Sequence, residues 1–287
     1  MNAILQIGIV IIYFAALQDF YAISSRPASF DRRRPRTRLV APLAVMWILL
    51  YGVMLMIGFV LGDARLRLFS IGQIVNGMFF FPLVVAGMHF KNRLGTPSLP
   101  WLWAWRKHPR HSRLTSVAKR TGVKNPLLLL VFLFLAPFVF SIVLFTIVPP
   151  SMSEQAADAL RLGSQPSLAT ILLILNLLFA APLVEEIIFR HYLQTRLIAF
   201  FRRILPQGQS TGASLAVAAG IAISTLLFAF SHTNILTNDW LKYSQIIVLG
   251  VSLGWCQWRL GTEASIALHY TFNFSVLLAT PLLKISA

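Results

Sequence analysis

Long apolar segments that carry almost no charge limit the folds open to this chain more than any other feature. Most of them are long enough to cross the hydrocarbon core of a bilayer as a helix, which takes about 20 residues. Eight such segments can be marked, at about 3–23, 39–61, 69–89, 126–148, 168–200, 212–232, 243–260 and 262–283. We therefore predict an all-α, polytopic transmembrane bundle of about eight helices.

The composition agrees with a membrane protein. Hydrophobic residues make up 57% of the 287 positions and charged residues only 12%, with a mean hydropathy of +0.72. A soluble globular domain carries roughly 25% charged residues. No internal repeat or long low-complexity tract interrupts the pattern. We expect a single helical membrane domain over the whole chain, 1–287.

The charged residues that do occur are mostly basic and lie between the apolar segments. The sequence has 25 Lys and Arg against nine Asp and Glu, which gives a net charge of +16. Most of the basic residues fall in 25–38, 91–124 and 190–205. This pattern follows the positive-inside rule, so we predict that these three loops are cytoplasmic and contact lipid headgroups. Because topology explains the charge, we expect no nucleic-acid partner.

Two adjacent glutamates, Glu185 and Glu186, stand inside the fifth apolar segment. A carboxylate in the bilayer costs about 3 kcal/mol, so the pair needs partners or a protein cavity. Arg190 lies four residues after Glu186, on the same helical face and in the favourable order for an ion pair. Glu185 points about 100° away and is left free for proton chemistry. The alternatives are a polar clamp between helices or a proton pathway.

Two further pairs of residues at four-residue spacing follow in later apolar segments. Phe228 and His232 share a face at the end of the sixth segment, and His269 and Asn273 share a face of the eighth. Each has an ordinary interpretation: a histidine at a helix end is often interfacial, and a His–Asn pair can hydrogen-bond two helices together. Buried imidazole and amide groups need polar partners, so these side chains should face neighbouring helices or a wet cavity.

Together, Glu185, His232, His269 and Asn273 are sufficient for peptide hydrolysis. The carboxylate, helped by His232, can take a proton from a water molecule as it attacks a carbonyl group. His269 and Asn273 can donate hydrogen bonds to the oxyanion that develops. The alternative is a zinc ion held by Glu185, His232 and His269, with water in the open position. The sequence has no HExxH helix, which excludes a zincin-type site.

The order of the segments raises a problem for a shared site. A simple zigzag of spans places His232 and His269 toward opposite faces of the membrane. The seventh segment, at about 243–260, is short for a full span. A shared site therefore requires the chain to turn within the protein at this segment.

The three motifs, taken in order, resemble those of the CPBP family. This family comprises the type II CAAX prenyl endopeptidases and bacteriocin-processing membrane proteases, also called ABI proteins. The matching residues are Glu185-Glu186-x-x-x-Arg190, Phe228-x-x-x-His232 and His269-x-x-x-Asn273. Each motif is short by itself, but three in order, each in an apolar helix, are more specific. The resemblance covers about 168–283 and departs at His191, where the family often has glycine.

The resemblance implies a bundle with an intramembrane polar cavity and an endopeptidase that cuts a membrane-associated, prenylated or other peptide substrate. Carried over by motif, Glu185 activates water with His232, and His269 and Asn273 form the oxyanion hole. Glu186, Arg190 and Phe228 then support these groups. The resemblance favours a glutamate mechanism without a cofactor, with zinc as the alternative. Residues 168–283 form the CPBP-like catalytic core and 1–167 add accessory spans.

Two other functional classes fit the same residues. A non-catalytic membrane scaffold or bacteriocin-immunity protein of this fold would keep the motifs without turnover. An ion- or proton-coupled transporter would use the acidic pair, but inverted repeats or matched broken helices would be expected, and the sequence has neither. We therefore expect an intramembrane protease that contacts membrane lipids and a peptide or protein substrate.

Overall fold

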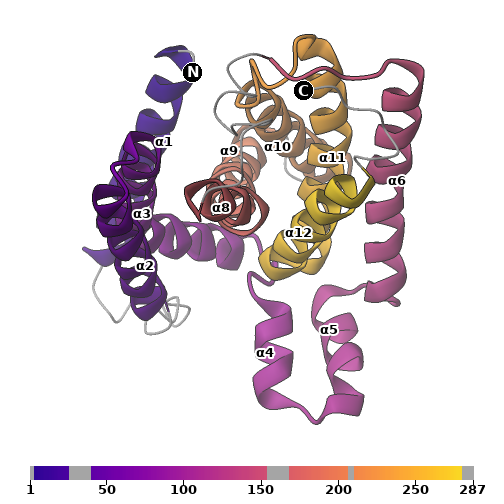
Figure 1. The fold of residues 1–287 in the computed structure, drawn as a ribbon. Coiled ribbons are helices and arrows are strands. Elements are labelled where there is room, and N and C mark those ends of the chain that lie inside the picture. The colour runs from indigo at the N-terminus through magenta and orange to yellow at the C-terminus, as the bar shows by residue number, and fades with distance from the viewer. Residues whose placement is uncertain (1–2, 26–39, 154–167, 206–209, 280–287) are drawn as a thin grey trace.

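The computed structural model describes residues 3–25, 40–153, 168–205 and 210–279, and most of these residues are helical (Figure 1). The helical elements are α1 (Ala3–Ser24), α2 (Val40–Val60), α3 (Ala64–Arg93), α4 (Pro100–Lys107), the single turn η3 (Arg110–Ser112), α5 (Arg113–Thr121), α6 (Pro126–Ile147), α8 (Leu168–Glu185), the π-helix η4 (Glu186–Gln194), α9 (Thr195–Ile204), α10 (Ser210–Phe230), α11 (Asp239–Leu260) and α12 (Thr262–Ala279). The predicted all-α bundle is confirmed. Most of the first basic loop, 25–38, lies outside the described residues.

All eight apolar segments predicted from the sequence contain a long helix. Among the described residues, six helices are long and apolar enough to cross a membrane: α1, α2, α3, α6, the continuous helix α8–η4–α9, and α10. The chain is therefore a multi-pass membrane protein. Helices α11 and α12 are less apolar because they carry polar side chains such as Gln245, Gln257 and Ser265. The predicted count of eight spans stays a prediction.

The helices are arranged around the long central helix α8–η4–α9. Helices α1, α2 and α3 lie on one side of it, while α10, α11 and α12 lie on the other (Figure 1). Helix α6 packs on the outside of α11 and α12, and α3 packs directly against η4 and α9. Helices α4 and α5 form a hairpin that projects from one end of the bundle (Figure 1). The central helix thus contacts both groups of helices.

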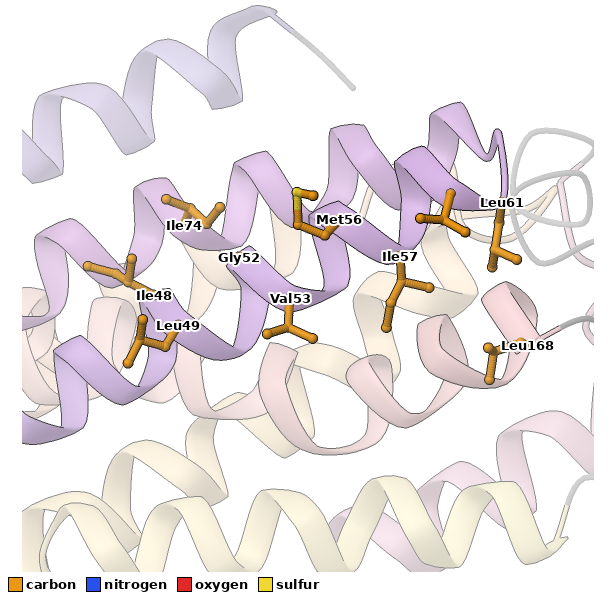
Figure 2. Close-up of a pocket in the computed structure, with 10 residues that line it drawn as sticks. Ile48, Leu49, Gly52, Val53, Met56, Ile57, Leu61, Ile74 and Leu168 are labelled. Carbon is orange, nitrogen blue, oxygen red and sulfur yellow. The ribbon is translucent and has the colours of Figure 1, made fainter.

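Much of the outer surface is apolar. Side chains such as Leu49 of α2 and Phe132 of α6 are about two-thirds exposed. A groove of about 710 Å³ between α2, α3 and the start of α8 is lined almost wholly by apolar atoms, with Val53 and Ile57 on one wall and Leu168 on the other (Figure 2). Exposed apolar surface of this extent suits contact with lipid chains.

The turn between α11 and α12 is buried beneath the connection from α3 to α4. Gly261 adopts a φ of 100°, and a Cβ atom there would lie 2.4 Å from Cδ of Pro100. The backbone N–H of Thr262 donates to the Ser98 carbonyl at 3.1 Å. Only glycine suits this conformation and this close approach. The chain therefore reverses inside the protein, as the shared site required, after a full helix of 22 residues rather than a short one.

The first turn of α12 also holds the projecting hairpin in place. Helix α4 has no side-chain cap of its own, and Glu263 Oε1 accepts a hydrogen bond from the Leu102 N–H in its first turn at 2.9 Å. Trp101 Nε1 donates to the Leu260 carbonyl at 3.1 Å. A carboxylate at a helix N-terminus is stabilising because it pairs with otherwise unsatisfied N–H groups. Glu263 therefore ties α4 to α12.

Candidate active site

The acidic pair stands at a change in helix geometry. Glu185 is the last residue of α8, and Glu186 is the first residue of the π-helix η4. Pro182 lies just before this junction in α8. π-Helical segments are rare and are frequent at functional sites. The backbone irregularity therefore coincides with the residues that the sequence singled out.

The Glu185 carboxylate lies between two imidazole rings from different parts of the chain. Its Oε1 is 3.8 Å from His232 Nε2, and its Oε2 is 3.7 Å from His269 Nε2. The relative solvent exposure of the Glu185 side chain is 25%, compared with 14% for His232 and 3% for His269. The structure thus brings three of the four predicted catalytic residues together around a carboxylate that stays partly open.

His232 follows the end of α10, and its unprotonated ring nitrogen, Nε2, faces Glu185. Its Nδ1 lies 2.9 Å from the Phe228 carbonyl oxygen and 3.2 Å from Ser231 Oγ. A carbonyl oxygen can only accept, so Nδ1 carries the ring proton of the neutral imidazole. Nε2 is then a hydrogen-bond acceptor. His232 therefore presents a base to the space beside Glu185.

His269 is oriented by the second glutamate. Its Nδ1 is 3.1 Å from Glu186 Oε1, and the ring is almost fully buried. Glu186 has no exposed surface and also accepts a hydrogen bond from the Ser265 hydroxyl. A carboxylate can only accept, so the contact with Glu186 fixes a ring proton of His269 on Nδ1. Glu186 and Ser265 thus hold His269 while its Nε2 faces Glu185.

The prediction of an ion pair between Glu186 and Arg190 is wrong. Among the described residues, Arg190 forms no ion pair, and the Glu186 carboxylate turns to Ser265 and His269 on α12 instead. The prediction assumed regular α-helical spacing, whereas these residues lie in the π-helix η4, where the turn is wider. Arg190 stays close enough for its charge to act on Glu186, without direct contact.

Arg190 packs on an aromatic ring instead. Its guanidinium carbon lies 4.2 Å from the centre of the Phe228 ring, a cation–π contact. Phe228 also meets the rings of His232 and His269 edge-on, with centroids 4.7 and 5.9 Å away. Both Arg190 and Phe228 are completely buried. Phe228 therefore forms a common contact for the buried cation and both histidines.

Asn273, the fourth predicted catalytic residue, lies one turn beyond His269 on α12. Its side chain is half-buried and makes no hydrogen bond to any described residue. Residues four apart on a helix share a face, so Asn273 lies on the same side of α12 as His269. Its amide is therefore available to a ligand rather than committed to a neighbouring helix.

The structure adds two polar residues that the sequence interpretation did not include. Ser265 precedes His269 by four residues, so the row Ser265–His269–Asn273 could have been recognised as one polar stripe on α12. Lys242 on α11 lies near enough for its charge to interact with Glu185, and its Nζ donates to Gln245 at 3.0 Å. No spacing pattern links Lys242 to Glu185, because only the tertiary fold brings them close.

His191, the departure from the usual glycine, lies outside this cluster. It is buried, with Nε2 3.0 Å from the Val84 carbonyl and Nδ1 2.7 Å from Thr262 Oγ1. The carbonyl must accept, so Nε2 carries the proton and the Thr262 hydroxyl donates to Nδ1. His191 thus joins η4 to α3 and α12, and its role is in packing.

The same residues do not fit a zinc site. The part of the chain that the structure describes has no group of three or more His, Cys, Asp and Glu side chains arranged to hold a metal ion. Glu185 turns a different oxygen toward each histidine, with 3.8 and 3.7 Å between the paired atoms. A catalytic zinc needs three protein ligands converging on one point.

Comparison with known protein families identifies the region that carries this cluster. A family model described as type II CAAX prenyl endopeptidase Rce1-like matches residues 167–275. The chain carries an Rce1-like domain. The match confirms the resemblance to the CPBP family, and Glu185, His232, His269 and Asn273 all lie within it. Comparison with curated proteins and with solved structures gave no match.

The Rce1-like domain includes α8 to α11 and most of α12, whereas α1, α2 and α3 lie outside the matched range. Its family is a family of membrane proteases. The helices outside it nevertheless contribute contacts to η4, such as the Val84 carbonyl that receives a hydrogen bond from His191. The matched domain is therefore packed against the preceding helices along its central helix.

Proposed function

We propose that the chain is an integral-membrane endopeptidase that uses Glu185 to activate water for attack on a peptide bond. The observation that carries this proposal is the partly exposed Glu185 carboxylate between the Nε2 atoms of His232 and His269, at 3.8 and 3.7 Å. Both separations exceed a direct hydrogen bond, so the carboxylate is free to engage a further molecule.

In the first step, a water molecule beside Glu185 attacks the carbonyl carbon of the substrate. Glu185 takes the proton that the water loses, and the bare Nε2 of His232 accepts a hydrogen bond from the water and orients it. The electron pair of the carbonyl bond moves to its oxygen. The attack therefore requires an ionised Glu185 and a neutral His232.

The oxyanion is stabilised from α12. This step requires a proton on both ring nitrogens of His269, so that Nε2 donates, and the Asn273 amide donates from the next turn of the same helix. Ionised Glu186 stabilises the charged ring through Nδ1, so it acts as a positioning residue rather than a proton carrier. When the tetrahedral intermediate collapses, the carbon–nitrogen bond breaks, and the leaving nitrogen takes the proton from Glu185.

We infer that the substrate is a membrane-associated peptide, and that prenylated CAAX peptides are the first class to test. The Rce1-like match names this chemistry for the family, and the catalytic residues lie in a bundle of lipid-facing helices. We also propose that 168–283 forms the catalytic core of one membrane domain, with 1–167 as accessory spans. The basic hairpin of α4 and α5 within 91–124 and the basic helix α9 within 190–205 then lie at the cytoplasmic face.

The decisive experiment compares wild type with Glu185→Gln in detergent, using prenylated CAAX peptides and a quenched peptide library. The substitution keeps the shape of the side chain and removes the base, so cleavage should fall about 10³-fold. Glu263→Gln is the matched control, because Glu263 lies outside the cluster and glutamine can still accept from the Leu102 N–H. Thermal melting of all three proteins excludes misfolding.

Each outcome separates the hypotheses. Cleavage lost in Glu185→Gln alone, at unchanged melting temperature and with a strong zinc chelator present throughout, supports the glutamate mechanism. Activity that the chelator abolishes and zinc restores would replace it with a metal mechanism. Absence of cleavage by folded wild type across both substrate sets would favour the non-catalytic scaffold.

A further inference from the structure

A second cavity, far along the central helix from Glu185, has the lining of a binding site. It measures about 530 Å³ and lies between α1, α3 and α9, close to the ends of these three helices. Its charged lining residues are Arg93, Arg196, Arg203 and Asp19. We call this cavity the basic pocket. It lies close to the basic end of the bundle, from which the α4–α5 hairpin also projects.

The basic pocket has an excess of positive charge. The single carboxylate, Asp19, is already engaged: Arg196 Nε donates to its Oδ2 at 2.7 Å, and the Tyr192 hydroxyl donates to the same oxygen at 2.6 Å. Arg93 and Arg203 are exposed and form no hydrogen bond or ion pair with any described residue. Two cations are therefore left to attract an anion into the pocket.

Apart from His89, the remaining wall of the basic pocket is apolar. Ile23, Phe90, Leu197 and Phe200 contribute to it, and Phe200 is half-exposed on the outside of the bundle. Cations next to an apolar wall, at the ends of membrane-crossing helices, match the boundary between lipid headgroups and acyl chains. Cations in the last turn also stabilise a helix C-terminus, but that alone does not require three arginines around one hollow.

We propose that the basic pocket binds the phosphate group of an anionic phospholipid, with the start of its acyl chains against the apolar wall. The guanidinium groups of Arg93 and Arg203 hold the phosphate oxygens through paired N–H donors, the geometry that arginine offers to phosphate. Basic pockets between membrane helices are known to take anionic headgroups. A bound lipid would fill the basic pocket between α1, α3 and α9.

The position of the basic pocket connects it to the catalytic helix. Tyr192 belongs to η4, the π-helix that begins at Glu186, and its hydroxyl reaches Asp19 on α1. Arg196 follows one turn later, and its Nε donates to the same carboxylate oxygen of Asp19. A ligand that binds only the folded arrangement stabilises it by mass action. Anionic lipid should therefore raise the melting temperature of the protein.

The test compares the double variant Arg93→Gln/Arg203→Gln with wild type by native mass spectrometry. The proteins are released from nanodiscs of phosphatidylcholine with or without phosphatidylglycerol. Wild type should retain phosphatidylglycerol selectively, and the variant should bind it about 30-fold more weakly, since each arginine near the surface contributes about fivefold. The matched control is Lys107→Gln/Lys119→Gln, which removes two exposed cations from last turns of α4 and α5.

Four results would count against the proposal. Equal loss in the two double variants would assign the effect to general surface charge, and no loss in either would remove the site. Displacement of the lipid by inorganic phosphate at moderate concentration would make the ligand a free anion. If the glutamine variant has a lowered melting temperature in pure phosphatidylcholine, the double variant Arg93→Lys/Arg203→Lys replaces it in the test. This variant keeps the positive charges and loses the paired N–H donors. Unchanged lipid binding in that variant would count against the arginine–phosphate contacts.

Discussion

Two polar clusters flank the π-helix η4, one at each end, and they differ in how completely their atoms are paired. At the beginning of η4, Glu185 faces two histidines at 3.7 and 3.8 Å, beyond the usual hydrogen-bond range. At the end of η4, His191 uses both ring nitrogens, at 2.7 and 3.0 Å, and Tyr192 donates to Asp19 at 2.6 Å. The first cluster has capacity left for a substrate, whereas the second is already satisfied.

The difference shows how chemistry and packing can be told apart within one apolar helix. Both clusters cost free energy to bury, and both consist of residue types that a catalytic site could use. A buried group whose hydrogen bonds are complete mainly holds its neighbours in place. A partly exposed group with incomplete contacts can bind and react. Substitutions at the beginning of η4 should therefore change turnover, and substitutions at its end should change stability.

The largest effect in this set is expected for Glu186→Gln. The amide no longer stabilises the charged His269 ring, so the oxyanion loses a donor, and kcat should fall about 10³-fold. Steady-state kinetics on a cleaved peptide measures the change, with Glu263→Gln as the control. A KM effect with unchanged kcat would show that Glu186 does not act through His269.

The second-largest effect is expected for Asn273→Ala, which should lower kcat about 10²-fold. Asn273 makes no hydrogen bond to any described residue, so the melting temperature should stay near that of wild type. Thr271→Ala on the same helix is the control, because the Thr271 hydroxyl bonds only to the Ala267 carbonyl of its own helix. A variant that melts early but still turns over would identify Asn273 as a helix clamp.

At the other end of η4, His191→Ala should destabilise the fold by about 2–4 kcal/mol. It removes two buried hydrogen bonds and leaves a cavity beside α3 and α12. Denaturant unfolding in detergent measures the loss, and the exposed His111→Ala serves as the control. Turnover per folded molecule should stay within about tenfold of wild type; loss of turnover in a stable protein would place His191 in the catalytic cluster.

The smallest effect is expected for Tyr192→Phe. Only one hydrogen bond to Asp19 is lost, and Arg196 still pairs with that carboxylate, so the destabilisation should be about 1 kcal/mol. The same unfolding measurement applies, with Tyr21→Phe on the exposed face of α1 as the control. An equal effect of both substitutions would mean that the contact between α1 and η4 contributes nothing specific.

Much of the fold could be predicted from hydropathy, because a membrane span needs a long apolar helix. The boundaries were less accurate where other forces act. Helix α3 begins at Ala64 rather than near 69, since Asp63 caps its first turn and extends it beyond the apolar stretch. The hairpin of α4 and α5 was predicted only as part of the basic loop 91–124, because its helices are too short to stand out in the hydropathy pattern.

The sequence predicted which residues belong to the candidate site better than it predicted the contacts between them. Four-residue spacing predicts that His269 and Asn273 share a face, and α12 is a regular α-helix over both residues. The same rule failed for Glu186 and Arg190, because η4 is not an α-helix. Partners such as Ser265 for Glu186 come from another helix, and spacing along one helix carries no information about them.

The proposed catalytic cluster has a consequence for how the protein matures during synthesis. Glu185, His232 and His269 come from three segments, and the last lies in α12, beyond the buried turn at Gly261. A nascent chain that has inserted every helix up to α11 still lacks His269 and Asn273. The proposed protease should therefore stay inert toward neighbouring polypeptides at the translocon until α12 has folded back into the bundle.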